Sequence, residues 1–131
     1  ESCAPLMRKL GLNGIKINAT AVFTFEQIRT VARSLVHAPA ILSVFAGRIA
    51  DTGRDPIDYL IEARRVKSST TQVLWASTRE VFNIKEAEGV CDIITVSPDL
   101  LAKTVLFGKD LTLYSLETVR QFHEDAKGVV L

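Results

Sequence analysis

The spacing of apolar residues alternates between two periods along most of the chain. From Ile15 to Phe23 every odd position is apolar, which is the period of a strand. From Phe25 to Val36 apolar residues recur at helical spacing, with charged residues between them, so this segment is predicted to be an amphipathic helix. Ala40 to Ala46 is a nearly continuous apolar run ended by Gly47, typical of a parallel strand covered on both faces.

The same succession continues to the end of the chain. An Asp or Ser followed directly by a proline is a sequence signal for the start of a helix, and it occurs at residues 55–56 and 97–98. The further elements predicted are a helix from Pro5 to Leu10 stopped by Gly11, a helix from Asp55-Pro56, a strand from Gln72 to Ala76, a short helix opened by Thr78 or Arg79 and ended by Gly89, a strand from Asp92 to Val96, a helix from Ser97-Pro98 to Val105, and a helix from Leu116 to Ala126 capped by Ser115, with Leu116, Val119 and Phe122 facing inward.

This order is a helix, four strand-helix units and a terminal helix, which predicts an α/β fold with a parallel sheet. Two architectures fit the order: a small doubly wound open sheet, or half of an eight-stranded (β/α)8 TIM barrel. The length of 131 residues suits one core, so residues 1–131 are predicted to be a single domain.

Charge and composition exclude several functions. With 16 basic and 15 acidic residues the net charge is +1, and neither half is a charged tail, which argues against nucleic acid and against a polybasic membrane surface. No apolar run approaches the length of a membrane helix, and the first residues do not resemble a signal peptide. We therefore expect a cytoplasmic protein. Because the chain starts at Glu1 without a Met, we also expect it to be part of a longer protein.

Polar residues follow the predicted strands where a ligand binds in either architecture, beyond the carboxyl ends of the strands. They are Asn18, Thr20, Ser43, Arg48, Ser77, Arg79, Thr95 and Ser97. Hydroxyls with two arginines and no cluster of carboxylates or histidines favour an anion and no metal. Arg79, beside Ser77 and the free amides of a following helix start, is a candidate phosphate clamp, and a surface ion pair is the alternative.

The remaining reactive side chains give no pattern of their own. The glycines form neither a dinucleotide fingerprint nor a P-loop, so no nucleotide cofactor is indicated. The isolated Cys3, Cys91 and Trp75 are predicted to be packed in the core, and His37 and His123 to have surface or packing roles.

Four segments, in order between Gly14 and Lys127, resemble the second half of a transaldolase, particularly the short kind related to fructose-6-phosphate aldolase. Residues 18–24 resemble the family's Asn-x-Thr-x-x-Phe-Ser segment on the fifth barrel strand, residues 43–48 its Ser-Pro-Phe-Val-Gly-Arg segment on the sixth, residues 76–79 its Ala-Ser-Phe-Arg segment on the seventh, and residues 89–96 its Ala-Gly-Cys-Asp-x-x-Thr-Ile segment on the eighth.

The resemblance implies a half-barrel of about four strand-helix units plus a C-terminal helix. It also implies a reaction in which a lysine forms a Schiff base with a ketose phosphate, and a dihydroxyacetone unit passes to an aldose phosphate without a cofactor. On the matching positions, Asn18 and Thr20 would contact the bound intermediate or its catalytic water, and Ser43 would line the same pocket. The phosphate would be bound by Arg48, Ser77 and Arg79.

Departures from the family pattern are Val44, Thr78 and Glu80, the last of which adds negative charge beside the expected phosphate. The family's Schiff-base lysine lies on the fourth strand, which precedes this segment. Lys16 is the only lysine on a predicted strand and lies toward its amino end, away from the ligand. The chain alone is therefore predicted to be inactive.

The sequence leaves two alternative hypotheses open. One is a non-catalytic half-barrel that binds phosphosugars or assembles with a partner half, since unpaired strand edges favour a homo-oligomer or association with the missing half. The other is an unrelated doubly wound domain.

Overall fold

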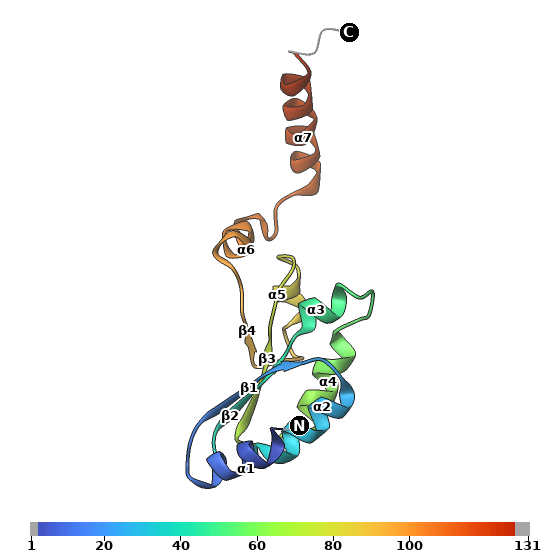
Figure 1. The fold of residues 1–131 in the computed structure, drawn as a ribbon. Helices are drawn as coiled ribbons and strands as arrows, with labels where there is room; N and C mark the ends of the chain where they lie inside the picture. The colour runs from blue at the N-terminus through green and yellow to red at the C-terminus, as the bar shows by residue number, and fades with distance from the viewer. Residues whose placement is uncertain (1–2, 128–131) are drawn as a thin grey trace. The chain divides into compact units, whose positions relative to one another are not determined.

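The computed structural model describes residues 3–127, which form a parallel four-stranded sheet with helices between the strands (Figure 1). The elements are α1 (Ala4–Leu12), β1 (Ile17–Val22), α2 (Phe25–Ser34), β2 (Ala40–Val44), α3 (Ala46–Ala50), α4 (Ile57–Val66), β3 (Thr71–Trp75), α5 (Asn83–Glu86), β4 (Ile93–Ile94), α6 (Pro98–Ala102), a 3-10 turn (Lys103–Leu106) and α7 (Leu111–Ala126). The α/β class and the parallel sheet are confirmed.

The strands lie in the order β1-β2-β3-β4, which is also their order along the chain. Ala40 of β2 pairs with Ile17 on one side and Thr71 on the other, and β4 pairs with Leu74 and Trp75. A doubly wound sheet reverses its strand order at a switch point, and this sheet has no reversal among the described strands. The topology therefore favours consecutive strands of a barrel over the doubly wound alternative.

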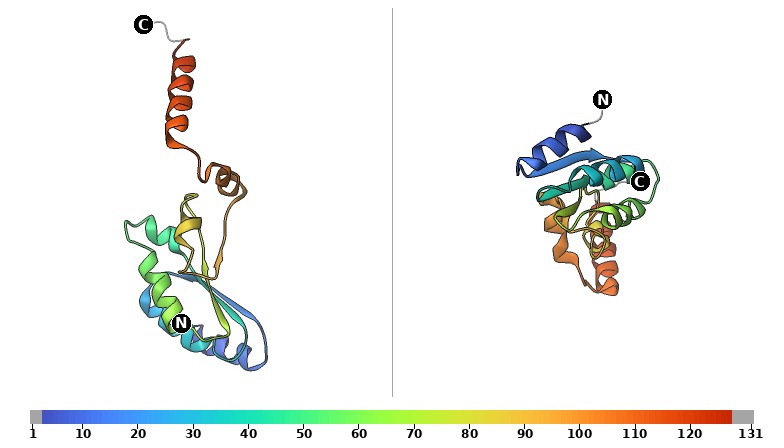
Figure 2. Two further views of the ribbon diagram at one scale, coloured as in Figure 1. Left: turned by 180° about the vertical axis from the view of Figure 1, so that it is seen from behind. Right: turned by 90° about the horizontal axis from the view of Figure 1, so that it is seen from below.

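One face of the sheet carries the hydrophobic core. Helix α2 contacts β1 and β2, α4 contacts β2 and β3, and the two helices lie side by side (Figure 1 and Figure 2). Between helices and sheet lie the fully buried Leu42, Val44, Val73, Ile28 and Leu60. Because strand residues alternate between faces, Asn18 and Ser43 belong to the face opposite these helices.

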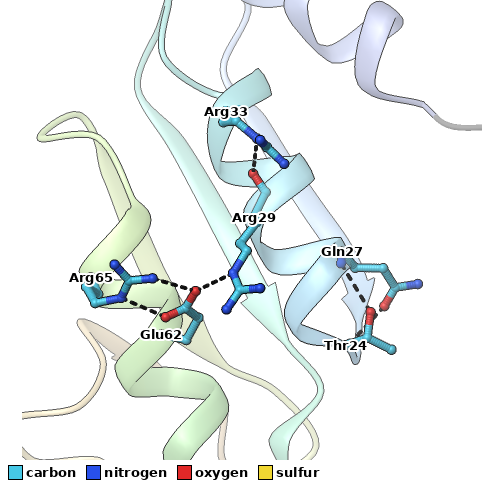
Figure 3. Close-up of polar contacts among 6 residues, drawn as sticks. All are labelled: Thr24, Gln27, Arg29, Arg33, Glu62 and Arg65. Atoms are coloured by element: carbon cyan, nitrogen blue, oxygen red, sulfur yellow. Dashed lines mark hydrogen bonds and ion pairs between the residues drawn. The ribbon is translucent and has the colours of Figure 1, made fainter.

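Helix α2 begins where the sequence pattern predicts, and a capping box explains its start (Figure 3). The Thr24 hydroxyl accepts from the backbone amide of Gln27 at 3.1 Å, and the Gln27 side chain accepts from the backbone amides of Phe23 and Thr24. These bonds satisfy amides that have no partner within the helix.

An ion network joins α2 to α4 (Figure 3). Arg29 Nε donates to Glu62 at 2.6 Å, and Arg65 donates to both carboxylate oxygens of Glu62 at 2.8 and 2.9 Å. The hydrogen bonds from Arg65 and Arg29 lower the pKa of Glu62 to about 2. A negative charge is thus held between the two helices.

The first strand departs from the predicted alternation. Ala21 has a φ of +58°, and the register with β2 shifts between Ala19 and Val22. Past this irregularity Val22 is buried and Ala21 is exposed. The prediction that Ala21 shares the apolar face was therefore wrong, because a strand irregularity exchanges the two faces.

Several predicted boundaries also differ. Gly11 lies inside α1, packed beside His37 and Ala38, and does not end the helix. The strand expected to reach Ala46 ends at Val44. The last helix starts at Leu111, because the side chain of Asp110, and not that of Ser115, accepts from the amide of Leu113 at 2.9 Å.

The described chain divides into two units, one up to Leu101 and one from Ala102 onward. The second holds the 3-10 turn and α7, where Lys109 pairs with Glu117 and lies 4.3 Å from the ring centre of Tyr114. Leu116, Val119 and Phe122 are at least half exposed, so the burial predicted for them is not found. No helix among residues 3–127 has both the length and the apolar character to cross a membrane.

Candidate functional site

Two of the predicted site residues meet on neighbouring strands. The hydroxyl of Ser43 on β2 donates to Oδ1 of Asn18 on β1 at 2.6 Å. Ser43 is buried and Asn18 is exposed. The bond therefore restrains the side-chain amide of Asn18 through its oxygen and leaves the amino group of that amide accessible. An oriented amide and hydroxyl can hydrogen-bond a polar ligand on this face of the sheet.

Thr20 follows Asn18 on β1 and is exposed. Both line a hollow of about 580 Å³ along β1, whose other walls come from α1 and α2, including Met7 and Val31. The strand order gives β1 one partner, β2, among the described strands. The hollow therefore runs along a strand edge with unpaired backbone groups.

The ends of β2 and β3 approach each other at Gly47. A Cβ at this position would lie 1.5 Å from the carbonyl oxygen of Ser77, so only glycine fits. The Gly47 amide donates to Ala76 O at 3.2 Å, and Ser77 itself has a φ of +63°. This backbone contact brings Arg48, which follows Gly47, to the loop that carries Ser77 and Arg79.

Arg79 is paired with an acidic residue that sequence reasoning did not assign. Its Nη2 donates to Oδ2 of Asp51 at 2.6 Å, and its Nε lies 3.0 and 3.1 Å from the two carboxylate oxygens. The Arg79 hydrogen bonds, together with the charges of Arg79 and Arg48, lower the pKa of Asp51. The ion-pair alternative predicted for Arg79 is therefore present, and the signal for it was Asp51 three positions after Arg48.

The amides after Ser77 are not free, so this part of the prediction was wrong. Asn83 Oδ1 accepts from the backbone amides of both Arg79 and Glu80 at 3.0 Å, and Asn83 Nδ2 donates to Glu86 at 2.7 Å. Helix α5 begins at Asn83, and not at residue 78 or 79. The buried Asn83 thus shapes the loop and leaves side chains, rather than these two amides, as donors for an anion.

Arg48 lies on the short helix α3 and is exposed, with its guanidinium carbon 5.3 Å from the ring centre of Phe45. A cation over an aromatic face is restrained but keeps its hydrogen-bond donors. Arg48 and Arg79 both act electrostatically on the carboxylate of Asp51, and the backbone of Ser77 lies at the Gly47 contact. Two guanidinium groups with a hydroxyl can bind a phosphate group.

The remaining candidates add no catalytic group. Lys16 is exposed and precedes β1. Among residues 3–127 no three His, Cys, Asp or Glu side chains gather as metal ligands. Trp75 is 1% exposed in the core, as predicted. Cys3 is exposed, so the core packing predicted for it is not found. Cys91 is half-buried, and this burial raises the pKa of its thiol.

Comparison with known proteins identifies the family. The family model described as Transaldolase/Fructose-6-phosphate aldolase matches residues 1–130. The chain is 31% identical over 115 residues to a probable transaldolase of Brucella anthropi, covering 85% of this chain and 51% of the relative. It is 32% identical over 93 residues to a probable transaldolase of Mesorhizobium japonicum, covering 68% and 41%.

A transaldolase of Xanthomonas oryzae pv. oryzae is 33% identical over 111 residues, covering 73% of this chain and 33% of the relative. The chain thus spans about half the length, or less, of the curated relatives it matches. The parallel sheet in chain order agrees with part of the family's barrel. The chain belongs to the transaldolase/fructose-6-phosphate aldolase family.

Proposed function

We propose that the chain supplies the phosphate-binding half of a transaldolase-like enzyme of sugar phosphates. The enzyme would transfer a dihydroxyacetone unit from a ketose phosphate to an aldose phosphate through a Schiff base. The observation that carries the proposal is that the segments bearing Arg48 and Arg79 meet at the Gly47–Ser77 contact, with both arginines acting on Asp51. Binding energy collected at a remote phosphate orients the reacting carbonyl.

In this proposal Asn18, Thr20 and Ser43 act closer to the reacting carbon atoms than the phosphate-binding residues do. The Ser43 hydroxyl holds the Asn18 amide at 2.6 Å, and Thr20 follows on the same strand. In the proposed enzyme Asn18 and Thr20 contact the bound intermediate or its catalytic water, and Ser43 lines the pocket. Fixed donors on a rigid strand stabilise developing charge at little reorganisation cost.

The Schiff-base lysine is proposed to lie outside residues 1–131. A nucleophilic lysine needs a pKa lowered by burial or by a neighbouring charge, and Lys16 is exposed. In this proposal the 131-residue chain is inactive alone, and the activity belongs to a longer protein of the cytoplasm.

A second candidate is a half-barrel that assembles with a partner half or with another copy. It is favoured by the exposed edge of β1 and the hollow along it. A barrel closes only when each edge strand is paired, so the partner would add a strand beside β1.

The test is a titration of the ¹⁵N-labelled chain with fructose 6-phosphate, followed by NMR, with fructose as the matched ligand. We expect weak binding, with a dissociation constant on the order of 1 mM, and shifts centred on residues 47–51 and 77–83. The Arg79→Lys variant keeps the charge but loses the bidentate geometry, and should bind about tenfold more weakly. Equal shifts with fructose, or shifts confined to other residues, would contradict the phosphate site.

A further inference from the structure

The guanidinium of Arg79 presents one edge to Asp51 and leaves the other edge available. Nε and one hydrogen of Nη2 are used by the carboxylate, at 2.6 to 3.1 Å. Nη1 and the second hydrogen of Nη2 form the remaining edge, which meets no acceptor within the described part of the chain. A guanidinium has donors for two bidentate partners at once, so the ion pair does not block a second anion.

Both partners of this ion pair are anchored to the Gly47 contact. The Asp51 amide donates to Gly47 O at 3.0 Å at the end of α3. The Cγ of Arg79 lies 3.2 Å from the position that a Cβ at residue 47 would take. The aliphatic part of Arg79 thus lies beside Gly47, and the hydrogen bonds to Asp51 restrain the rotation of its guanidinium group.

The pair contributes little to folding, because its side chains are 46% and 51% exposed and exposed ion pairs stabilise weakly. The pair matters more for ligand binding. An arginine side chain without a partner loses rotamer entropy when a ligand immobilises it, whereas one already ordered by an ion pair has lost that entropy before the ligand binds.

We propose that Asp51 is a positioning residue that holds Arg79 with its free edge ready for a phosphate group. The inference rests on the proposed function, because it requires a phosphate at Arg79. From electrostatics alone, removal of the Asp51 carboxylate would strengthen phosphate binding, because a negative charge beside the site is lost. A positioning role predicts the opposite: without Asp51, Arg79 is no longer held in place, and phosphate should bind about two- to tenfold more weakly.

The test uses inorganic phosphate as the probe and NMR titration of the 131-residue chain. We expect Asp51→Asn, which keeps one acceptor, to bind more weakly than wild type, and Asp51→Ala more weakly still. The control is Glu88→Gln, which removes one negative charge from an exposed pair with Lys85 and should leave the affinity unchanged. Melting temperatures and amide spectra of the variants check that each is folded.

A second readout follows the Nε–H signal of Arg79. Its chemical shift should change in the ligand-free Asp51→Ala variant, and should stay near the wild-type value when the wild-type chain is saturated with phosphate. If phosphate instead shifts the wild-type signal to the value seen in Asp51→Ala, then phosphate has displaced Asp51 from Arg79, and the proposal is wrong. It is equally wrong if either Asp51 variant binds phosphate as well as, or better than, wild type.

The two proposals fail in different ways. If the wild-type chain shows no phosphate binding that depends on Arg79, the proposed function fails and the role of Asp51 fails with it. If Arg79-dependent binding is present and the Asp51 variants keep full affinity, only the positioning role is overturned.

Discussion

The backbone of Gly47 lies so close to the carbonyl group of Ser77 that a methyl group at residue 47 would fall 1.5 Å from its oxygen. The contact joins the segment after β2 to the segment after β3. Arg48 and Asp51 stand on one side of it, and Arg79 on the other. Because both partners are backbone, neither can rotate away, and the arrangement of the candidate site depends on the absence of a side chain at Gly47.

Gly47→Ala should therefore destabilise the fold, by at least about 3 kcal/mol, since two backbone segments must separate to admit the methyl group. Chemical denaturation measures the loss. Gly11→Ala is the matched control, because a Cβ there meets His37 at 3.4 Å and Ala38 at 4.0 Å, both ordinary contact distances, and alanine improves helix propensity. A Gly47→Ala variant as stable as Gly11→Ala would show that the Gly47–Ser77 approach is not as close as described.

Asn83→Ala should loosen the loop after β3. The change leaves the amides of Arg79 and Glu80 without their acceptor, which costs about 1–3 kcal/mol for partly buried groups. We also expect weaker phosphate binding, because the backbone that carries Arg79 is no longer fixed. Denaturation and the NMR titration measure the two effects.

Asn83→Asp is the control for that loop. It retains an acceptor for both amides while it loses the donor to Glu86, so phosphate affinity should fall less than in Asn83→Ala. If Asn83→Ala binds phosphate like wild type, the loop geometry does not depend on this side chain.

The Glu62 network should make stability depend on pH in a defined window. The pKa of Glu62 is lowered from 4.5 to about 2 in the folded chain. Its contribution is therefore fully present above about pH 4.5 and is lost as the pH falls toward about 2. Glu62→Gln should melt at a lower temperature than wild type at neutral pH, and this difference should shrink through that window.

The comparison for Glu62 is Glu88→Gln, which removes the same charge from an exposed i,i+3 pair. Its melting temperature should stay near that of wild type, since such pairs are weak. A Glu62→Gln difference that persists unchanged at about pH 2 would rule out the ionised carboxylate as its source.

The sequence predicted the parallel sheet and the strand-helix order, because alternating periods report which residues are buried. The family was predicted from the resemblance of four ordered segments to transaldolases. The sequence did not predict the face exchange in β1, since the positive φ of Ala21 leaves no pattern in the sequence. The sequence pattern predicts that the last helix starts at Leu116 with Ser115 as its cap, although Asp110, an equally suitable cap residue, lies five residues earlier. Choosing between two caps requires the geometry of the chain before the helix.

The sequence placed Arg48, Ser77 and Arg79 after neighbouring strands, and the segments that carry them do meet at the Gly47–Ser77 contact, because the carboxyl ends of parallel strands share one edge. That these residues bind a phosphate stays a prediction. The Asp51 ion pair and the Asn83 bonds to two amides depend on loop conformation. Loop conformation in turn depends on the Gly47–Ser77 contact between residues thirty positions apart in the sequence.

The central claim is that these residues belong to a Schiff-base enzyme whose lysine lies elsewhere in the whole protein. Its most direct test is to purify the natural gene product from its own cells, reduce it with borohydride in the presence of fructose 6-phosphate, and locate the modified lysine by peptide mass spectrometry. We predict an adduct on a lysine outside residues 1–131. An adduct on a lysine of this chain, or none on a folded gene product, would contradict the account.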